Sequence, residues 1–448
     1  MLFIRSSLTK ISRTGKLLQP KLGFLSILLN AYRDNACDDM IFVPVHIGYD
    51  RVPEESSYLH ELGGGEKKPE SFLQLLRAGK VLKKRYGRIY IQFDEPISMN
   101  DLLSDYGEKN GDFGENRMAS MSSKEQNALC RNLGYRIVNA IDRVTVVSPH
   151  AIVAGAILNC SRPRFSYNYL MADIETYINY LHSRKATLAD TLLVDYIRAV
   201  DYVFDLYIQQ KFIERISPTD KSKRGKTGMK TDGNRPVPEN VETLYRANVS
   251  RRPLLEYYKN NGITFFVPGA FTALAILEKD AFQFSISDLL PGYKFLQEFF
   301  INEFAYEVDR TPEYLVRKNI RAFIEDAMLM PHPSLADTFN LTSAGFRKLK
   351  LFSGFLRTYF ESYRIVLNFF TRYPKNFIDS KDRMKKIQSM GNRMYKRKEI
   401  ERAEALSRMS YKNAMDFFST HGIKGSENSG KIEFYSDAIK KYMEHLPS

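Results

Sequence analysis

Helical spacing of apolar residues dominates the chain beyond about residue 122, and this periodicity limits the fold more than any other feature. Apolar residues there recur every three or four positions, as they do along the buried face of an amphipathic helix. The stretches with this spacing are 124–143, 166–182, 190–215, 293–306 and 311–328. The sequence therefore predicts a mostly α-helical C-terminal region.

The longest helical pattern runs from about Ser343 to Tyr373 and ends before Pro374. Large apolar residues form a stripe along it: Phe352, Phe355, Leu356, Tyr359, Phe360 and Tyr363. A stripe of this kind usually packs into a protein core. We interpret it as core packing.

The first hundred residues carry signals for strands. Residues 40–49 form a nearly continuous apolar run, typical of a buried strand, although Pro44 inside it belongs at an edge or a bulge. Residues 88–93 alternate between faces and predict a second strand. Helical spacing between the two strands involves Phe72, Leu75, Leu76, Gly79 and Leu82. Strand, helix and strand predict a parallel crossover unit, and thus an internal strand of an α/β sheet flanked by helices.

Two composition changes divide the chain. Residues 217–238 are polar, basic and rich in Gly and Pro, which is typical of an exposed linker, and a weaker gap runs from Asp105 to Ser123. We therefore predict an α/β piece over 1–105, a helical domain over 122–216, a linker over 217–238 and a helical C-terminal domain over 239–448.

The charge balance favours anionic partners. The chain has 66 Lys and Arg against 52 Asp and Glu, a formal net charge of +14, which suits phosphate-bearing metabolites, anionic lipid surfaces or nucleic acid. No motif of an RNA-binding or DNA-binding module is present, so we expect no nucleic-acid partner. The cysteines Cys37, Cys130 and Cys160 are widely spaced, and we expect reduced thiols and no metal site.

Half of the excess charge lies in residues 381–412, which carry eleven Lys or Arg against four Asp or Glu. This segment has a possible apolar side: Met384, Ile387, Met390, Met394 and Tyr395. Two interpretations stay open, a solvated helix face and a surface attracted to anionic lipid. The longest apolar stretch, about 263–277, is shorter than the ~20 residues that span a bilayer, so we expect membrane-surface or soluble residence.

Four segments carry a family resemblance. Residues 42–52, Phe-Val-Pro-Val-His-Ile-Gly-Tyr-Asp-Arg-Val, resemble the fourth conserved block of the glycerolipid acyltransferases. Residues 58–71 are similar to a Tyr-x-x-Glu-Leu-x-Gly segment of PlsB-type glycerol-3-phosphate acyltransferases, and residues 146–151 and 257–263 resemble the helical C-terminal region of that family. The resemblance implies the remainder of an acyltransferase α/β domain followed by helical domains.

A weaker resemblance lies at the start. Residues 12–18 look like the tail of the third conserved block, but Leu8, Thr9 and Ile11 stand where the family has Glu, Gly and Arg. The resemblance implies that Arg13 is the phosphate ligand and that Pro44 and Tyr49 shape the acyl-donor side. The substrate-binding residues that it implies are Ser12, Arg13, Gly15, Pro44 and Tyr49.

The family's base is the histidine of a His-x-x-x-x-Asp pair that precedes the third block, so we expect it upstream of Met1 and expect this chain to be N-terminally truncated. The 448 residues contain one match, His332 to Asp337. It follows the fourth block by nearly three hundred residues and is flanked by prolines, and such short motifs arise by chance. We interpret it as a decoy and assign no catalytic residue to this chain.

The resemblance implies transfer of an acyl group from acyl-CoA or acyl-carrier protein to sn-glycerol 3-phosphate, giving lysophosphatidic acid. It implies no metal or organic cofactor, and it implies a peripheral position on the cytoplasmic face of the inner membrane. We expect this chain alone to be inactive. The alternatives are a dihydroxyacetone-phosphate acyltransferase and a non-catalytic protein that interacts with membrane surfaces.

Overall fold

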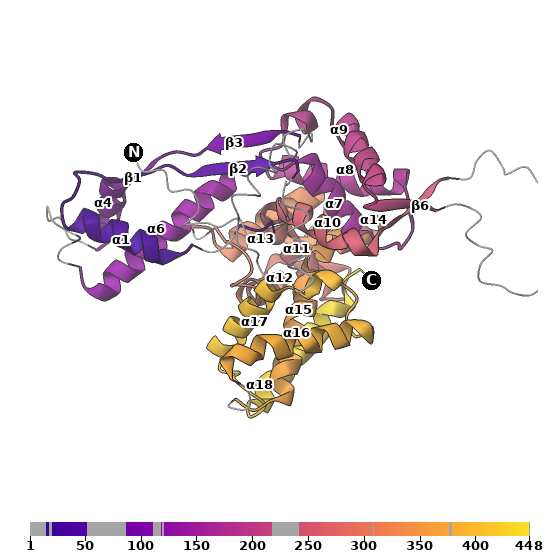
Figure 1. The fold of residues 1–448 in the computed structure, drawn as a ribbon. Helices are drawn as coiled ribbons and strands as arrows, with labels where there is room; N and C mark the ends of the chain where they lie inside the picture. Colours follow the sequence, from indigo (N-terminus) through magenta and orange to yellow (C-terminus); the bar gives the residue numbers. More distant parts are fainter. Residues whose placement is uncertain are drawn as a thin grey trace, which may run out of the picture.

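The computed structural model describes residues 15–17, 20–51, 87–110, 118, 121–216, 242–307, 309–375 and 379–447. An elongated N-terminal part lies beside a larger helical body, and the last helices extend below that body in Figure 1. Ser12, Arg13, the predicted helix near 72–82 and the predicted linker 217–238 lie outside the described residues.

The N-terminal part has its own small core between α1 and α6. Its elements are α1 (Leu22–Arg33), β1 (Ile41–Phe42), β2 (Val45–Tyr49), β3 (Ile89–Phe93), β4 (Ile97–Ser98), α4 (Met99–Asn110) and α6 (Ser123–Arg143). Leu25 and Leu29 of α1 pack with Leu129 and Leu133 of α6 in this core. Helix α6 begins where Ser122 forms a capping box with Glu125, which satisfies the first free N–H groups of the helix. The predicted helix over 124–143 is thus confirmed.

The strands of this part pair antiparallel, so the predicted parallel crossover unit is wrong. Strand β2 pairs with β3, and β1 pairs with β4, each in a two-stranded sheet. Within the described residues, β2 has a partner strand on one side only, so it is not the predicted internal strand. Alternating and apolar patterns identify strands but do not show whether two strands pair parallel or antiparallel. The long connection between β2 and β3 is compatible with both arrangements. The predicted run over 40–49 is split before Pro44, which lacks the N–H group that a ladder needs.

The helical body contains most of the described chain, which confirms the predicted class of an α/β piece followed by a mostly helical region. Its first elements are α7 (Pro149–Asn159), β5 (Phe165–Ser166), α8 (Tyr167–Ser183), α9 (Asp190–Gln209), β6 (Ile213–Ile216), β7 (Leu244–Ala247), η2 (Val249–Arg251), α10 (Arg252–Asn260), α11 (Ile263–Leu277), β8 (Gln283–Ser285), α12 (Ile286–Phe299) and α13 (Pro312–Glu325). Strands β5, β7 and β6 form one small antiparallel sheet.

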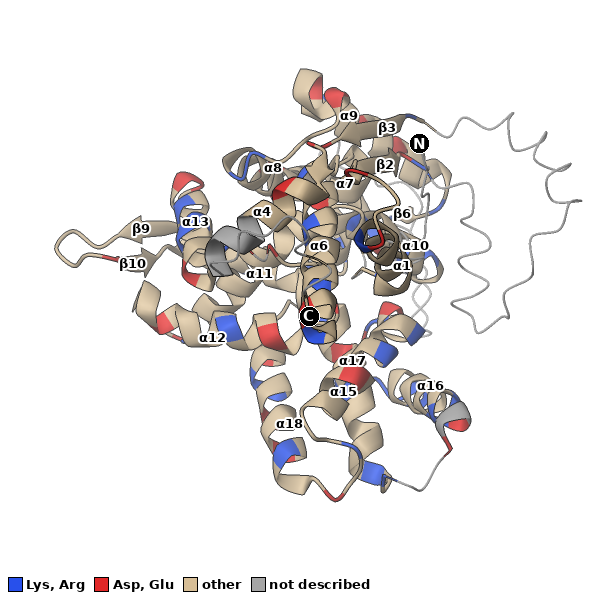
Figure 2. Ribbon diagram, turned by 90° about the vertical axis from the view of Figure 1, so that its left-hand side faces the viewer, with Lys and Arg blue, Asp and Glu red and all other residues tan. Residues whose placement is uncertain are grey.

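The later elements complete the body and form its lower end. They are β9 (Leu329–Pro331), β10 (Thr338–Leu341), α14 (Ser343–Ser353), η3 (Gly354–Leu356), α15 (Arg357–Arg372), α16 (Ser380–Lys396), η4 (Ala403–Ala405), α17 (Arg408–Thr420) and α18 (Ser429–Glu444). Strand β10 pairs antiparallel with both β8 and β9, and the β9–β10 hairpin projects from the body in Figure 2.

Most predicted helices are present, with shifted ends. The predictions over 166–182 and 311–328 match α8 and α13 closely, whereas the prediction over 190–215 is too long because α9 ends at Gln209 and β6 follows. The prediction over 293–306 is displaced, since α12 starts at Ile286. Ser285 and Asp288 form a capping box there, and this capping fixes the start of the helix.

One buried cluster of apolar side chains runs from Val146 to Leu446 through the whole body. Residues of both predicted helical domains contribute to it, and the predicted domain boundaries stay a prediction. All six residues of the aromatic stripe are buried, which confirms the interpretation as core packing. The long pattern breaks into α14, η3 and α15 at Gly354, where a Cβ atom would lie 3.0 Å from atoms of Asn159 and Pro447.

Helix α11 lies in the middle of this core and contains Pro268. Among the described residues no single helix is both long and apolar enough to cross a bilayer. One pair of consecutive helical segments within the described residues reaches the required length and hydropathy when taken together: Val249–Asn260 and Ile263–Leu277. The axes of these two segments are bent by 94° relative to each other.

Candidate functional site

Gly15 is the first of the predicted site residues that the structure describes, and it packs against the end of α10. Its φ of 82° lies in the left-handed region that favours glycine. A Cβ atom at this position would lie 2.3 Å from the carbonyl oxygen of Tyr257 and 2.9 Å from Oδ1 of Asn261. Both the backbone conformation and the close approach therefore require glycine here.

Lys16 extends from this turn into the helical body. Its side chain is almost fully buried and forms an ion pair with the equally buried Glu303. The Lys16 ammonium also lies 4.3 Å from the centre of the Tyr359 ring, a cation–π distance. Tyr359 in turn donates a hydrogen bond to Oδ1 of Asn260 at 3.1 Å. Residues 15–17, the described part of the segment that resembles the third block, are thus fixed to the helical body by a buried polar cluster.

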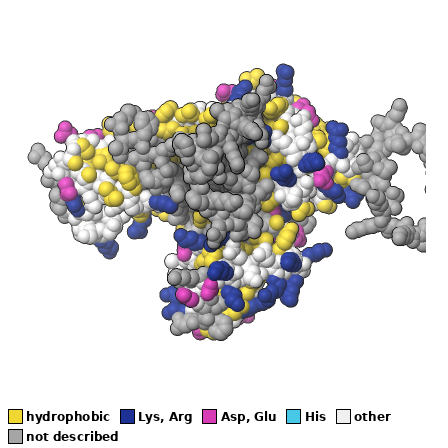
Figure 3. Space-filling model, in the orientation of Figure 1, with side chains coloured by type: hydrophobic (Ala, Val, Ile, Leu, Met, Phe, Trp, Pro, Cys, Tyr) yellow, Lys and Arg dark blue, Asp and Glu magenta, His cyan; other side chains and the backbone are white. Residues whose placement is uncertain are grey.

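Tyr49 lies on one face of the β2–β3 ribbon with other apolar side chains. Across the ribbon Tyr49 pairs with Ile89, and the neighbouring pairs on the same face are Ile47 with Ile91 and Val45 with Phe93. Ile89, Ile91 and Phe93 are 60%, 54% and 66% exposed. Figure 3 shows hydrophobic side chains on the surface where β1 to β4 lie in Figure 1. This apolar ribbon face is therefore open along β3.

Pro44 directly precedes β2, and its carbonyl oxygen accepts a hydrogen bond from the N–H group of Asp94 at 3.0 Å. Pro44 and Tyr49 thus belong to the ribbon, whereas Gly15 belongs to the surroundings of α10. The structure brings the first two together and places Gly15 on a different element.

The opposite face of the ribbon is polar and carries His46, which the sequence analysis did not single out. His46 Nδ1 lies 3.3 Å from Oγ1 of Thr145, which itself donates a hydrogen bond to the carbonyl oxygen of Ile141. Nδ1 must therefore carry the proton and donate it to Thr145. Its Nε2 atom is buried and has no hydrogen-bond partner among the described residues, and burial lowers the pKa of His46 to about 4. His46 is thus a neutral imidazole whose Nε2 is an acceptor that no described residue engages.

A second buried histidine, His150, lies in the first turn of α7 after the cap residue Ser148. Its Nδ1 lies 3.2 Å from the Tyr207 hydroxyl, and that hydroxyl also lies 3.3 Å from the His150 carbonyl oxygen. Burial, together with the positive charge of Arg51, lowers the pKa of His150 to about 3. His150 is therefore uncharged at neutral pH. The sequence feature that indicates this buried histidine is its position at the start of an apolar helix.

His332 and Asp337 are the first and last residues of the loop between β9 and β10, and they make separate contacts. Both carboxylate oxygens of Asp337 accept hydrogen bonds from Arg317, at 2.7 and 2.9 Å. His332 Nδ1 instead accepts hydrogen bonds from the backbone N–H groups of Ser334 and Leu335, at 3.2 and 3.1 Å. The Asp337 carboxylate thus binds Arg317 and does not orient the imidazole of His332.

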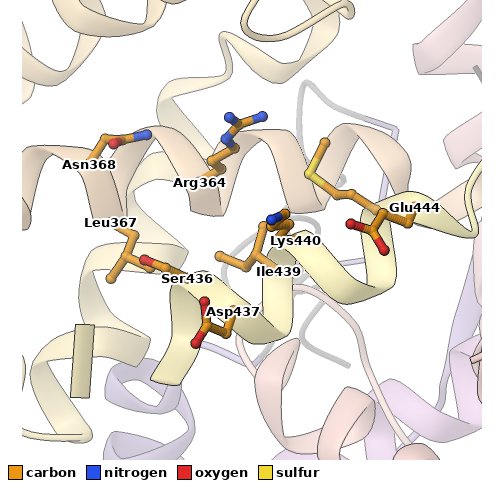
Figure 4. A pocket seen from close by; sticks show the side chains of 9 residues that line it. Arg364, Leu367, Asn368, Ser436, Asp437, Ile439, Lys440 and Glu444 are labelled. Atoms are coloured by element: carbon orange, nitrogen blue, oxygen red, sulfur yellow. The ribbon is translucent and has the colours of Figure 1, made fainter. Parts of the chain in front are cut away.

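A separate cavity of about 470 Å³ lies between α15 and α18. Figure 4 shows Arg364 and Asn368 of α15 on one side, with Asp437, Lys440 and Glu444 of α18 on the other. Of the predicted site residues that the structure describes, Gly15, Pro44 and Tyr49, none lines it. Within the described ranges no cluster of three or more His, Cys, Asp or Glu side chains has the arrangement of a metal site.

Comparison with known proteins decides the family. A sequence model of the glycerol-3-phosphate acyltransferase C-terminal region matches residues 58–427 of this chain. The chain belongs to this family. The predicted family is thus confirmed, and residues 58–71, 146–151 and 257–263 lie within the matched region. By name this is a family of acyl-transferring enzymes.

Several relatives named glycerol-3-phosphate acyltransferase align with long parts of the chain. The protein of Xylella fastidiosa (strain 9a5c) is 29% identical over 367 residues, which cover 80% of this chain and 38% of the relative. The protein of Pseudomonas syringae pv. syringae (strain B728a) is 27% identical, with 74% and 38% covered. The protein of Pseudomonas putida (strain GB-1) is 32% identical over 201 residues, with 43% and 24% covered. The chain thus spans less than two fifths of the length of the curated relatives it matches.

Proposed function

We propose that this chain is the C-terminal region of a glycerol-3-phosphate O-acyltransferase. The reaction moves an acyl group from acyl-CoA or acyl-carrier protein to the 1-hydroxyl of sn-glycerol 3-phosphate and gives lysophosphatidic acid. The observation that carries this proposal is the match of the family's C-terminal region to residues 58–427, together with the names of the aligned relatives.

The apolar ribbon face supports the assignment of the acyl-donor side. Tyr49, Ile47 and Val45 form a half-buried apolar wall with the side chains of β3, and an acyl chain is the part of the substrates that such a wall fits. Pro44 and Tyr49 keep their proposed role on this side. Arg13 keeps its proposed role as the phosphate ligand, by the resemblance of residues 12–18 to the third block.

The 448 residues by themselves do not catalyse the reaction in this proposal. Acyl transfer to a hydroxyl needs a base that removes its proton and a group that orients the base. The one His-x-x-x-x-Asp match in the sequence is His332 with Asp337, and Arg317 engages both carboxylate oxygens of that aspartate. His332 is therefore not assigned as the base, and we expect no activity from the 448 residues alone.

We also propose that the chain resides peripherally at the cytoplasmic face of the inner membrane, where lysophosphatidic acid would be released. Its net charge of +14 favours an anionic membrane surface as a partner. The acyl donors, acyl-CoA and acyl-carrier protein, are anionic as well, so the same sign of charge suits both partners.

A chimera tests the proposed reaction. Residues 58–427 of this chain replace the matching part of the Xylella fastidiosa relative, and the purified chimera is assayed for transfer of a labelled acyl group to glycerol 3-phosphate. We expect labelled lysophosphatidic acid. A chimera that melts cooperatively but transfers nothing contradicts the proposal. A folded chimera that prefers dihydroxyacetone phosphate in direct competition supports the alternative acyltransferase instead.

A further inference from the structure

Helix α16 exposes cations along one side. At about 100° per residue, six positions of the helix and its C-cap residue Arg397 fall within an arc of about 120° around the helix axis. Five of the seven are basic and exposed: Lys385, Lys386, Arg393, Lys396 and Arg397. Asp382 and Ser389 occupy the other two positions. We call the five cations the basic face of α16, and Figure 2 shows the blue segments of this helix at the edge of the molecule.

The adjacent side of α16 is buried in the helical body. Ile387, Met390 and Met394 are all buried and belong to the large core cluster. The apolar side that the sequence offered for contact with lipid is therefore occupied by protein. Any partner of α16 must bind the basic face alone, without inserting apolar side chains.

Little nearby negative charge neutralises the basic face. Lys385 lies 3.3 Å from Asp382, and Arg397 lies 3.9 Å from Glu399. Both pairs are solvent-exposed, and such pairs are weak and screened by salt. Lys386, Arg393 and Lys396 form no ion pair with any residue that the structure describes. The face thus keeps most of its charge.

We propose that the basic face of α16 is the surface by which this protein docks on anionic lipid headgroups. This inference rests on the proposed membrane residence, and it deepens that proposal by naming the residues. An anionic membrane attracts each nearby Lys or Arg without requiring shape complementarity. The core of a protein–protein interface is instead rich in aromatic residues and poor in lysine, and the arc on α16 has no aromatic or aliphatic residue at its centre.

Vesicle sedimentation tests the docking surface with the full 448-residue chain. Vesicles of neutral phosphatidylcholine are compared with vesicles in which about a third of the lipid is phosphatidylglycerol, at low and at high salt. Because each cation near such a surface raises the partition coefficient by about fivefold, we expect binding only to the anionic vesicles. We expect that binding to weaken strongly as salt shortens the Debye length.

Two variants with the same loss of charge locate the surface. The first replaces the basic face by glutamine: K385Q, K386Q, R393Q, K396Q and R397Q. The control replaces five exposed cations elsewhere: R131Q, R164Q, R198Q, K211Q and R321Q. We expect the first variant to lose at least about tenfold in the partition coefficient, whereas the control stays within about threefold of the parent chain.

Three results would overturn the inference: equal loss in both variants, binding that ignores lipid charge, or stronger binding to purified acyl-carrier protein than to anionic vesicles. If the first variant loses its cooperative melting transition, the double variant Lys386→Glu/Lys396→Glu takes its place with the same expectation. Acyl transfer does not enter the measurement. A failure of docking is therefore distinct from a failure of the proposed reaction.

Discussion

Lys16 and Glu303 form an ion pair in which both side chains are buried, although 287 positions separate them in the sequence. This pair fixes the segment after Gly15 to the region that follows α12, beside the ring of Tyr359. Residues 15–17, the described part of the segment that resembles the third block, are therefore packed into the helical body.

Removing one partner of this pair leaves the other charge buried. We expect Lys16→Met to lower the free energy of unfolding by about 3–5 kcal/mol, because Glu303 is left without its cation. Urea denaturation at constant pH measures the change. The double variant Lys16→Met/Glu303→Met should recover a large part of the loss. As a control, Lys385→Met breaks an exposed ion pair and should change the stability by less than about 1 kcal/mol. Equal effects of Lys16→Met and Lys385→Met would contradict the described burial.

Gly345 near the start of α14 has no room for a side chain. A Cβ atom there would lie 2.0 Å from the carbonyl oxygen of Met328, a backbone atom that cannot move aside cheaply. We expect Gly345→Ala to lower the stability by about 1–3 kcal/mol. Gly430 in α18 is the matched control, since nothing lies within 4 Å of its Cβ position. There Gly430→Ala should raise the stability by about 0.5–1 kcal/mol. Thermal melts of both variants decide the point, and a stabilised Gly345→Ala would refute the close contact.

His150 should make stability depend on pH in the acidic range. Its pKa in the folded chain is lowered to about 3 by burial, whereas an unfolded histidine titrates near 6.5. The stability that the neutral form contributes is complete above about pH 6.5 and is lost as the pH falls towards 3. In His150→Gln this loss is absent, so the stability of the variant relative to the parent chain should rise by up to about 1 kcal/mol for each pH unit lowered. Unfolding curves at several pH values measure this slope, and a flat difference would contradict it.

Asp142 should show the opposite sign. Burial raises its pKa to about 6, above the value near 3.9 of an unfolded aspartate. The stability linked to its protonated form is complete below about pH 3.9 and is lost as the pH rises through 6. We therefore expect Asp142→Asn to gain stability relative to the parent chain as the pH is raised from 4 to 6, by the same unfolding measurement. If both variants shift in the same direction, the assignment of these pKa values is wrong.

The helical part could be predicted because its signals are local. The stripe from Phe352 to Tyr363 repeats at helical spacing and is buried. The break at Gly354 could not be predicted from the apolar pattern, because the apolar residues keep their spacing through η3. The close approach of Asn159 and Pro447 to Gly354 is a tertiary contact, which local sequence does not show. For α16 the sequence correctly predicted a basic side and an apolar side but left open what covers the apolar side. The structure shows that Ile387 and Met390 of this apolar side are core residues.

The candidate site was less predictable because its contacts are long-range. Nothing local in Gly15 or Lys16 indicates a partner at Glu303, and nothing local in His46 indicates Thr145, which lies 99 positions away. The direction of β3 relative to β2 could not be predicted either, because alternation identifies a strand but not the strand that pairs with it. The family, in contrast, could be recognised from short segments such as residues 58–71, which lie within the region that the family model matches.

An acyl-transfer assay on the 448-residue chain alone tests the central claim most directly. The purified chain is incubated with labelled glycerol 3-phosphate and acyl-CoA or acylated carrier protein, beside the His332→Ala variant. We predict no lysophosphatidic acid above background from either protein, because the one His-x-x-x-x-Asp match, His332 with Asp337, has its carboxylate bound by Arg317. Robust acyl transfer by the parent chain that persists in His332→Ala would contradict the account.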